Sequence, residues 1–181
     1  DNVAGIGTLR QAVTWRNAAT RRFLAGVQTS ELVVFEEQST NQWDRRVIAT
    51  GSTVPAGQFQ VITGASVGTV LLGTLETGAW ATYVSATGDG RSWTFATLAQ
   101  RAGNSDLLSS YRGSLNALVR SNGQLALTGV DSKGQLIECA APVSGSGTWS
   151  VRNLSSALRV RTRLAGEALP VESGNRTIYI A

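Results

Sequence analysis

The sequence predicts an all-β fold of short antiparallel strands, and three observations lead to that prediction. Hydrophobic residues make up 42% of the 181 residues and charged residues only 15%, which is typical of a folded domain rather than a disordered chain. Short runs of β-branched and aromatic residues alternate with loops of Gly, Ser, Asn and Thr, which is the pattern of β-hairpins. One tryptophan-led segment also recurs along the chain, which indicates that the hairpins form a repeat.

Helices are not predicted, because few stretches keep apolar residues at i, i+3 and i+4 without a Gly or β-branched interruption. The best candidate for a short helical turn is NSDLLSSYRGSL, residues 104–115. A membrane span is not predicted either, because no apolar run approaches the ~18 residues that it requires.

The recurring segment reads Trp-x-x-x-x-Ile/Leu and begins at Trp43, Trp93 and Trp149. These tryptophans are 50 and 56 residues apart. Because they recur at one position of a repeat, we expect them to pack between neighbouring repeats rather than to stack on a ligand.

Each of these segments is the last of four predicted strands. The four strands of the three repeats read LRQAVTWR, RFLAGVQT, ELVVFEEQ and WDRRVI; FQVITGAS, VLLGTLET, AWATYVSA and WTFATL; and LNALVRSN, QLALTGVD, QLIECAAPV and WSVRNL. Tight polar turns at residues 29–30, 77–78 and 132–134 join the second strand to the third. Each repeat is therefore predicted to be a meander of four hairpin-linked strands.

Four antiparallel strands in about 50 residues are the blade of a β-propeller. The predicted blades cover approximately residues 8–50, 57–100 and 114–156, and LAGEALPVES with NRTIYIA fits two strands of a fourth blade at 163–181. The sequence thus predicts a single, partial β-propeller domain over residues 1–181, with about three and a half blades. Because a blade packs on its neighbours, we expect the rest of a longer propeller, or other chains, to complete the ring.

The segment SATGDGRSWTF resembles the Asp-box hairpin of sialidase-type β-propellers, whose pattern is Ser-x-Asp-x-Gly-x-Thr-Trp. Gly90 and Ser92 fit that pattern, but Gly88 stands at the Asp position and Asp89 is displaced by one residue. In that family the box is a folding element between the third and fourth strands, not a catalytic site. The repeats as a whole resemble the blades of bacterial β-propeller modules, lectin-like and degenerate Asp-box-like, in large secreted or cell-surface proteins.

The resemblance implies a non-enzymatic interaction or scaffolding module of an extracellular or cell-envelope bacterial protein, without a cofactor. A carbohydrate-binding, lectin-like propeller is one alternative, and a sialidase-like glycoside hydrolase is another. A hydrolase needs two converging carboxylates, whereas the acidic residues here are scattered along the chain. In strand alternation Glu138 points away from Ile137 and Cys139, so we expect it on an exposed face. The tyrosines, Tyr83, Tyr111 and Tyr179, have no recognisable glutamate partner by position.

Residue types further restrict the chemistry. The chain has no His, which excludes His-dependent nucleophile triads and argues against a zinc or haem site, so no metal site is predicted. Cys139 is the one cysteine and lies in an apolar run, which excludes an intrachain disulfide and favours a buried free thiol.

The candidate ligand-binding residues are two tryptophans outside the repeat register and three arginines. Trp15 and Trp80 are candidates for exposed aromatic platforms on which sugars stack. In LRVRTRL, Arg159, Arg161 and Arg163 would line one face of an extended strand. That face would suit a polyanion, in keeping with the net charge of +4, or it would be a solvated edge that discourages aggregation.

Overall fold

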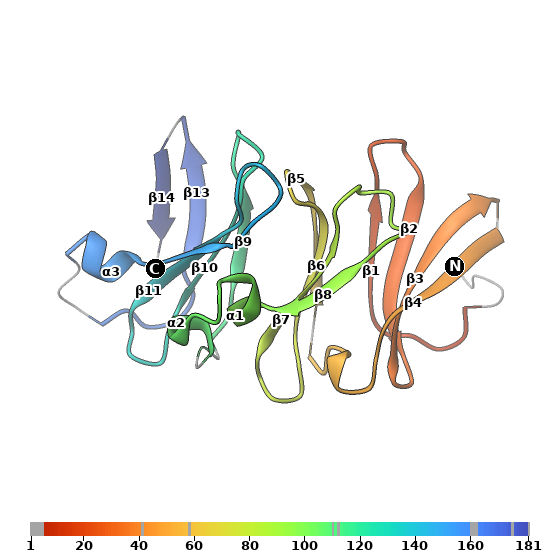
Figure 1. Ribbon diagram of the computed structural model, residues 1–181, viewed down its shortest axis with the longest axis horizontal. Coiled ribbons are helices and arrows are strands. Elements are labelled where there is room, and N and C mark those ends of the chain that lie inside the picture. Colours follow the sequence, from red (N-terminus) through yellow and green to blue (C-terminus); the bar gives the residue numbers. More distant parts are fainter. Residues whose placement is uncertain are drawn as a thin grey trace. The chain divides into compact units, whose positions relative to one another are not determined.

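The computed structural model confirms the all-β prediction (Figure 1). It describes residues 6–40, 42–57, 59–109, 111, 113–159, 163–174 and 176–180. Within these residues the strands form three four-stranded antiparallel sheets and one two-stranded antiparallel sheet. Each of the four repeat ranges predicted from the sequence contains one of these sheets.

The first two sheets are meanders in which neighbouring strands follow one another along the chain. The first sheet consists of β1 (Arg10–Arg16), β2 (Arg22–Gln28), β3 (Glu31–Ser39) and β4 (Gln42–Thr50). A short 3-10 helix, η1 (Gly51–Thr53), leads to the second sheet, which consists of β5 (Phe59–Ala65), β6 (Gly68–Thr74), β7 (Trp80–Ser85) and β8 (Thr94–Thr97).

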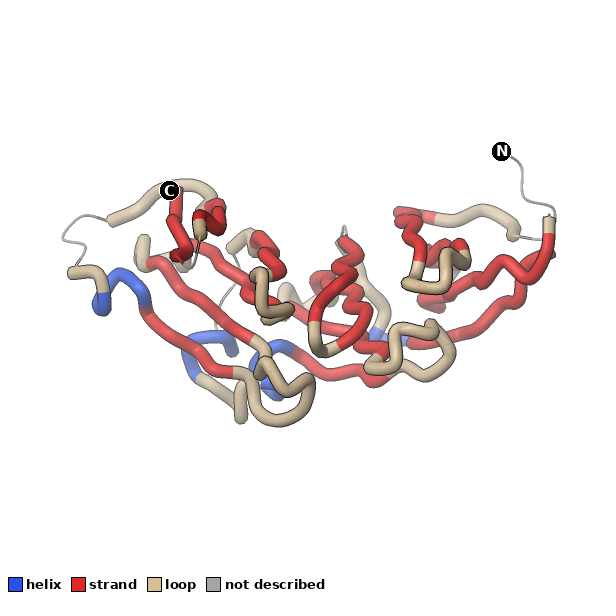
Figure 2. Tube along the Cα trace, turned by 90° about the horizontal axis from the view of Figure 1, so that it is seen from above, coloured by secondary structure: helices blue, strands red, loops and turns tan. Residues whose placement is uncertain are grey.

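The third sheet has the same meander order, and the fourth sheet is a hairpin. The third sheet consists of β9 (Asn116–Val119), β10 (Leu125–Val130), β11 (Leu136–Ala140) and β12 (Ser150–Asn153). The hairpin consists of β13 (Leu169–Ser173) and β14 (Arg176–Ile180). Figure 2 traces the strands in red and the short helices in blue.

The described residues contain three short helices, α1 (Leu98–Arg101), α2 (Asp106–Ser109) and α3 (Leu154–Ala157), so the expectation that helices are absent is wrong at α1 and α3. The segment singled out for a helical turn contains α2. The α1 helix begins with a capping box, in which Gln100 N donates to Thr97 Oγ1 at 3.2 Å and Thr97 N donates to Gln100 Oε1 at 2.8 Å. A helix of four residues is too short to show a periodic apolar pattern, so the capping pair Thr-x-x-Gln is the local sequence signal for α1.

The chain divides into two compact units. The first unit comprises Asp1–Thr63 and Gly68–Ala96, with the first two sheets, and the second comprises Gly64–Val67 and Thr97–Ala181, with the third sheet and the hairpin.

The core of the first unit lies between its two sheets. Trp15, Phe23 and Val34 of the first sheet belong to one buried apolar cluster with Leu71 and Tyr83 of the second sheet. Burial of such large apolar side chains is the main stabilising contribution to a fold of this size.

The opposite face of the first sheet is partly covered by the segment that precedes β1. Ile6 is 5% exposed and packs in a cluster with Val33 and Phe35, and Leu9 and Trp43 pack against that cluster. This face therefore has a covered centre, and the pocket described below lies beside it.

Candidate functional site

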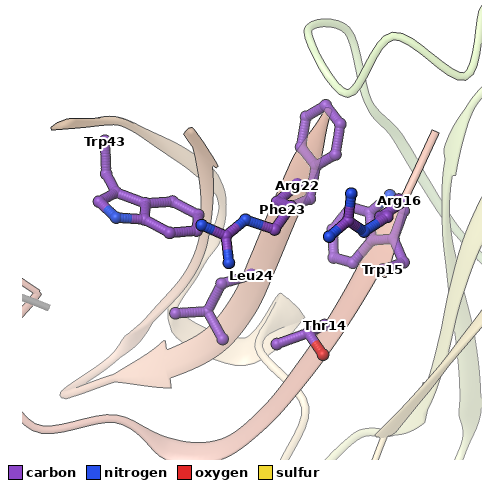
Figure 3. Close-up of a pocket in the computed structure, with 7 residues that line it drawn as sticks. All are labelled: Thr14, Trp15, Arg16, Arg22, Phe23, Leu24 and Trp43. Atoms are coloured by element: carbon purple, nitrogen blue, oxygen red, sulfur yellow. The ribbon is translucent and has the colours of Figure 1, made fainter. Parts of the chain in front are cut away.

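The candidate site is a pocket of about 420 Å³ in the first unit (Figure 3). Its lining residues come from β1, β2 and β4, and they are Thr14, Trp15, Arg16, Arg22, Phe23, Leu24 and Trp43. A volume of this size is in the range of small-molecule sites.

Strand register places most of the polar lining on one face of the sheet. Arg16 is the direct cross-strand neighbour of Arg22, and Thr14 is that of Leu24. Arg22 forms a salt bridge with Glu37 of β3, and Glu37 in turn lies opposite Trp43 of β4. Trp15 pairs with Phe23 on the other face, because neighbouring residues of a strand point to opposite sides.

Glu37 fixes the orientation of the Arg22 guanidinium. Arg22 Nε donates to Glu37 Oε2 at 2.5 Å, and Arg22 Nη2 donates to Glu37 Oε1. The hydrogen bond from Arg22 is the main cause that lowers the pKa of Glu37, and the charge of Arg16 adds to it. The same pair raises the pKa of Arg22, so both groups are ionised at neutral pH.

Arg16 has fewer and weaker hydrogen bonds than Arg22. Its Nη1 donates to the Thr20 carbonyl at 3.5 Å, which is a long and weak hydrogen bond. In the part of the chain that the structure describes, Arg16 forms no salt bridge. The guanidinium of Arg16 is therefore available to a ligand in the pocket.

The two tryptophans predicted as exposed platforms differ in position. Trp15 is only 8% exposed, stacks on Phe23 at a centroid distance of 5.2 Å and meets Trp93 edge-on at 6.2 Å, so it is not an exposed platform. Its Nε1 atom has no hydrogen-bond partner among the described residues. Trp80 is half-buried at the start of β7, where it pairs with Thr74, and it does not line the pocket.

The three arginines predicted to share a strand face do not all lie in a strand. Arg159 follows α3 in a turn, with a φ of 53°, and Arg163 lies in an irregular segment before β13. Arg161 lies outside the described residues. A left-handed residue interrupts an extended strand, so the expected alternation of side chains does not hold at Arg159.

The recurrent tryptophans lie where the outermost strands begin. Trp43 is the second residue of β4, Trp93 directly precedes β8, and Trp149 directly precedes β12. Trp93 packs against the core of the first unit, and Trp149 is 5% exposed. Trp43 packs on the Ile6 cluster and also lines the pocket, so it contributes to both packing and the site.

Glu138 is buried, which corrects the prediction of an exposed side chain. It is 1% exposed in β11, and Arg120 Nη2 donates to its Oε2 at 2.6 Å while Arg152 donates to its Oε1. Tyr179 Oη also donates to Oε2, at 2.5 Å, so this tyrosine does have a glutamate partner. Burial raises the pKa of Glu138, but the hydrogen bonds from Arg152 and Tyr179 and the charges of both arginines outweigh it and leave the pKa lowered.

Glu36 in the first unit is held in a similar way. It is 1% exposed, and it accepts hydrogen bonds from Arg21 at 2.5 Å and Arg46 at 3.0 Å. Burial raises the pKa of Glu36, and the hydrogen bonds from these two arginines lower it below its usual value. A buried carboxylate that is held ionised by arginines is poorly suited to donate a proton to a substrate.

Five pocket residues are not among the site residues predicted from the sequence: Thr14, Arg16, Arg22, Phe23 and Leu24. The sequence does contain a signal for the two arginines. Arg16 ends one predicted strand and Arg22 begins the next, so a hairpin makes them cross-strand neighbours.

The described residues contain no group of three or more Cys, Asp or Glu side chains that could hold a metal ion. They also contain no helix that is long and apolar enough to cross a membrane. Comparison of the chain with protein-family models and with curated protein sequences gave no match.

Proposed function

We propose that the sheets are blades of a β-propeller and that the chain is a non-enzymatic interaction or scaffolding module of an extracellular or cell-envelope protein. The observation that carries this proposal is the outer face of the β13–β14 hairpin. Four large aliphatic side chains of this hairpin are 44–58% exposed, and they are Leu169, Val171, Ile178 and Ile180.

These four residues share one face. Leu169 pairs with Ile180 and Val171 pairs with Ile178, so the two pairs alternate with the pair of Pro170 and Tyr179. Tyr179 packs against the cluster of the second unit that contains Leu136, which makes its face the inner one. The aliphatic face is therefore the outer face of the hairpin.

A two-stranded hairpin with an apolar outer face is an incomplete sheet. Isolated hairpins are marginally stable in water, and contiguous exposed apolar patches mark interaction surfaces. Among the described residues β13 and β14 have no further partner strand, whereas the other sheets have four strands. We expect two further strands, from the rest of a longer propeller or from other chains, to pair along β14, and another sheet to pack on the outer face.

The experiment is to measure self-association and the binding of a hydrophobic dye by the chain. Ile178→Asp is expected to weaken self-association by about tenfold or more and to reduce dye binding, because it places a charge on the apolar face. Val47→Asp is the matched control, because Val47 is 42% exposed on β4 in the other unit. A chain that remains monomeric at high concentration and binds no dye would contradict the proposal.

Carbohydrate binding is the second candidate function, and the pocket of the first unit favours it. Trp43 offers an aromatic surface and two arginines offer hydrogen-bond donors, which is the combination that sugar sites use. Glycoside hydrolysis is disfavoured by the arginine-bound state of Glu36 and Glu138. Turnover of a fluorogenic glycoside that is lost on substitution of a carboxylate would contradict a non-enzymatic role.

A further inference from the structure

We propose that the pocket on β1, β2 and β4 binds a saccharide that carries a carboxylate or sulfate group, with Arg16 and Arg22 on the anionic group and Trp43 on the sugar ring. This inference rests on the second candidate function, carbohydrate binding, and not on the scaffolding role of the hairpin. It differs from the sequence-based expectation, which placed the sugar on Trp15 and Trp80.

The charge arrangement indicates an anion. Arg16 and Arg22 are direct cross-strand neighbours on one face, where Cβ atoms are about 4.5–5.5 Å apart and like charges destabilise a sheet. Glu37 compensates Arg22, but Arg16 has no salt-bridge partner in the described segments. The pair therefore has one uncompensated positive charge, and an anionic group that bridges both guanidiniums would relieve the repulsion.

The hydrogen-bonding geometry leaves donors for that anion. Glu37 accepts hydrogen bonds from Nε and Nη2 of Arg22, and Nη1 of Arg22 has no hydrogen-bond partner among the described residues. The salt bridge holds the planar guanidinium in place, so its remaining donors are oriented before a ligand arrives. Arginine forms bidentate hydrogen bonds with carboxylate and sulfate oxygens, which fixes the position of the charged end of the ligand.

The remainder of the pocket suits a sugar ring rather than a bare ion. Figure 3 shows the Arg22 guanidinium extended toward the Trp43 indole, with Leu24 and Thr14 on the same part of the pocket. Trp43 is half-buried, so part of its ring is available to the C–H groups of a sugar. The Thr14 hydroxyl can donate a hydrogen bond to one sugar hydroxyl and accept a hydrogen bond from another. A volume of about 420 Å³ is larger than an inorganic anion needs.

The test is isothermal titration of the whole chain with digalacturonic acid, with neutral galactobiose and with sodium sulfate. We expect the acidic disaccharide to bind at least about tenfold more tightly than either of the other two, and more weakly as salt is added. Arg16→Gln and Trp43→Ala are each expected to weaken binding by about tenfold. Arg45→Gln is the matched control, because Arg45 is paired with Glu31 on the same sheet and does not line the pocket.

Three results would overturn the inference. These are no binding of the acidic disaccharide, binding of sulfate alone with equal affinity, or equal losses in Arg16→Gln and Arg45→Gln. Circular dichroism of each variant separates loss of binding from loss of folding. The self-association measurement, repeated on Arg16→Gln, is expected to be unchanged, so failure of this inference is distinguishable from failure of the scaffolding proposal.

Discussion

Replacing Glu138 with alanine tests whether the buried ion pairs hold the second unit together. The side chain of Glu138 is 0% exposed, and it accepts hydrogen bonds from Arg120, Arg152 and Tyr179. Tyr179 belongs to β14, so this carboxylate links the hairpin to the third sheet. Its removal leaves a largely buried arginine, Arg120, and a tyrosine hydroxyl without their acceptor.

The expected cost follows from how much each partner is exposed. Removing one member of a buried ion pair costs about 3–5 kcal/mol, because the other charge remains buried. The side chain of Arg152 is 57% exposed and can turn to water, whereas that of Arg120 is 15% exposed. We therefore expect the lower end, about 3 kcal/mol for Glu138→Ala. Glu37→Ala is the control, and it is expected to lower the stability much less than Glu138→Ala, because its partner Arg22 is 53% exposed and can turn to water.

The assay is urea unfolding followed by tryptophan fluorescence, with hydrogen exchange to localise the effect. With a slope of about 3 kcal/mol per molar urea, Glu138→Ala is expected to lower the midpoint by about 1 M. Amides of β13 and β14 are expected to exchange faster, because the link through Tyr179 is lost. Equal midpoint shifts in Glu138→Ala and Glu37→Ala would refute the reasoning, because burial would then have no part in the cost.

The same carboxylate predicts how stability depends on pH. The folded-state pKa of Glu138 is lowered, whereas an unfolded glutamate titrates at about 4.3. The unfolded state therefore binds more protons between the two values, and stability rises with pH there. Stability from Glu138 is present above about pH 4.3 and is lost as the pH falls through the folded-state pKa. Glu138→Gln is expected to make the stability depend less steeply on pH in this acidic range. An unchanged pH dependence would contradict the assignment of this effect to Glu138.

Two further predictions concern the loop of the second sheet and the thiol. Gly90 has a φ of 70°, and a Cβ there would lie 2.5 Å from Phe23 Cε1, so Gly90→Ala is expected to cost about 2–4 kcal/mol in urea unfolding. Gly88 has a φ of 63° with its nearest neighbour 3.9 Å away, so Gly88→Ala is expected to cost only about 1 kcal/mol, and equal costs would argue against the overpacking. Burial, with the charge of Glu138, raises the pKa of the Cys139 thiol to about 12, so the thiol should resist a disulfide reagent at about pH 8 until the chain unfolds.

Strand positions could be predicted from the sequence because each strand is a short apolar run between turn residues. The burial of Glu138 could not be predicted in this way, although strand alternation correctly places its side chain on the opposite face from Ile137 and Cys139. All five residues of β11 are buried, so both faces of this strand are covered. Arg120 and Tyr179 contact Glu138 on the second face of the strand. Both residues are remote from Glu138 in sequence, so alternation along one strand does not reveal them.

The candidate site was missed for a related reason. In TWR of β1, alternation places Trp15 and Arg16 on opposite faces, but it does not say which face meets the second sheet. The structure puts Trp15 on the covered face, against Phe23 and Trp93, and Arg16 on the face with Trp43. Trp43, which was predicted to be a packing residue because it recurs in the repeats, thus provides the aromatic surface of the pocket.

The pocket and the hairpin face belong to different units, so their two proposed roles are separable by experiment. Substitutions that share no partner usually combine additively. In the double variant Arg16→Gln/Ile178→Asp, sugar affinity is expected to equal that of Arg16→Gln, and self-association is expected to equal that of Ile178→Asp. If Ile178→Asp alone weakened sugar binding, the saccharide site would depend on assembly. The pocket would then act as one part of a site that associated chains complete, and titrations at increasing protein concentration would show affinity rising with assembly.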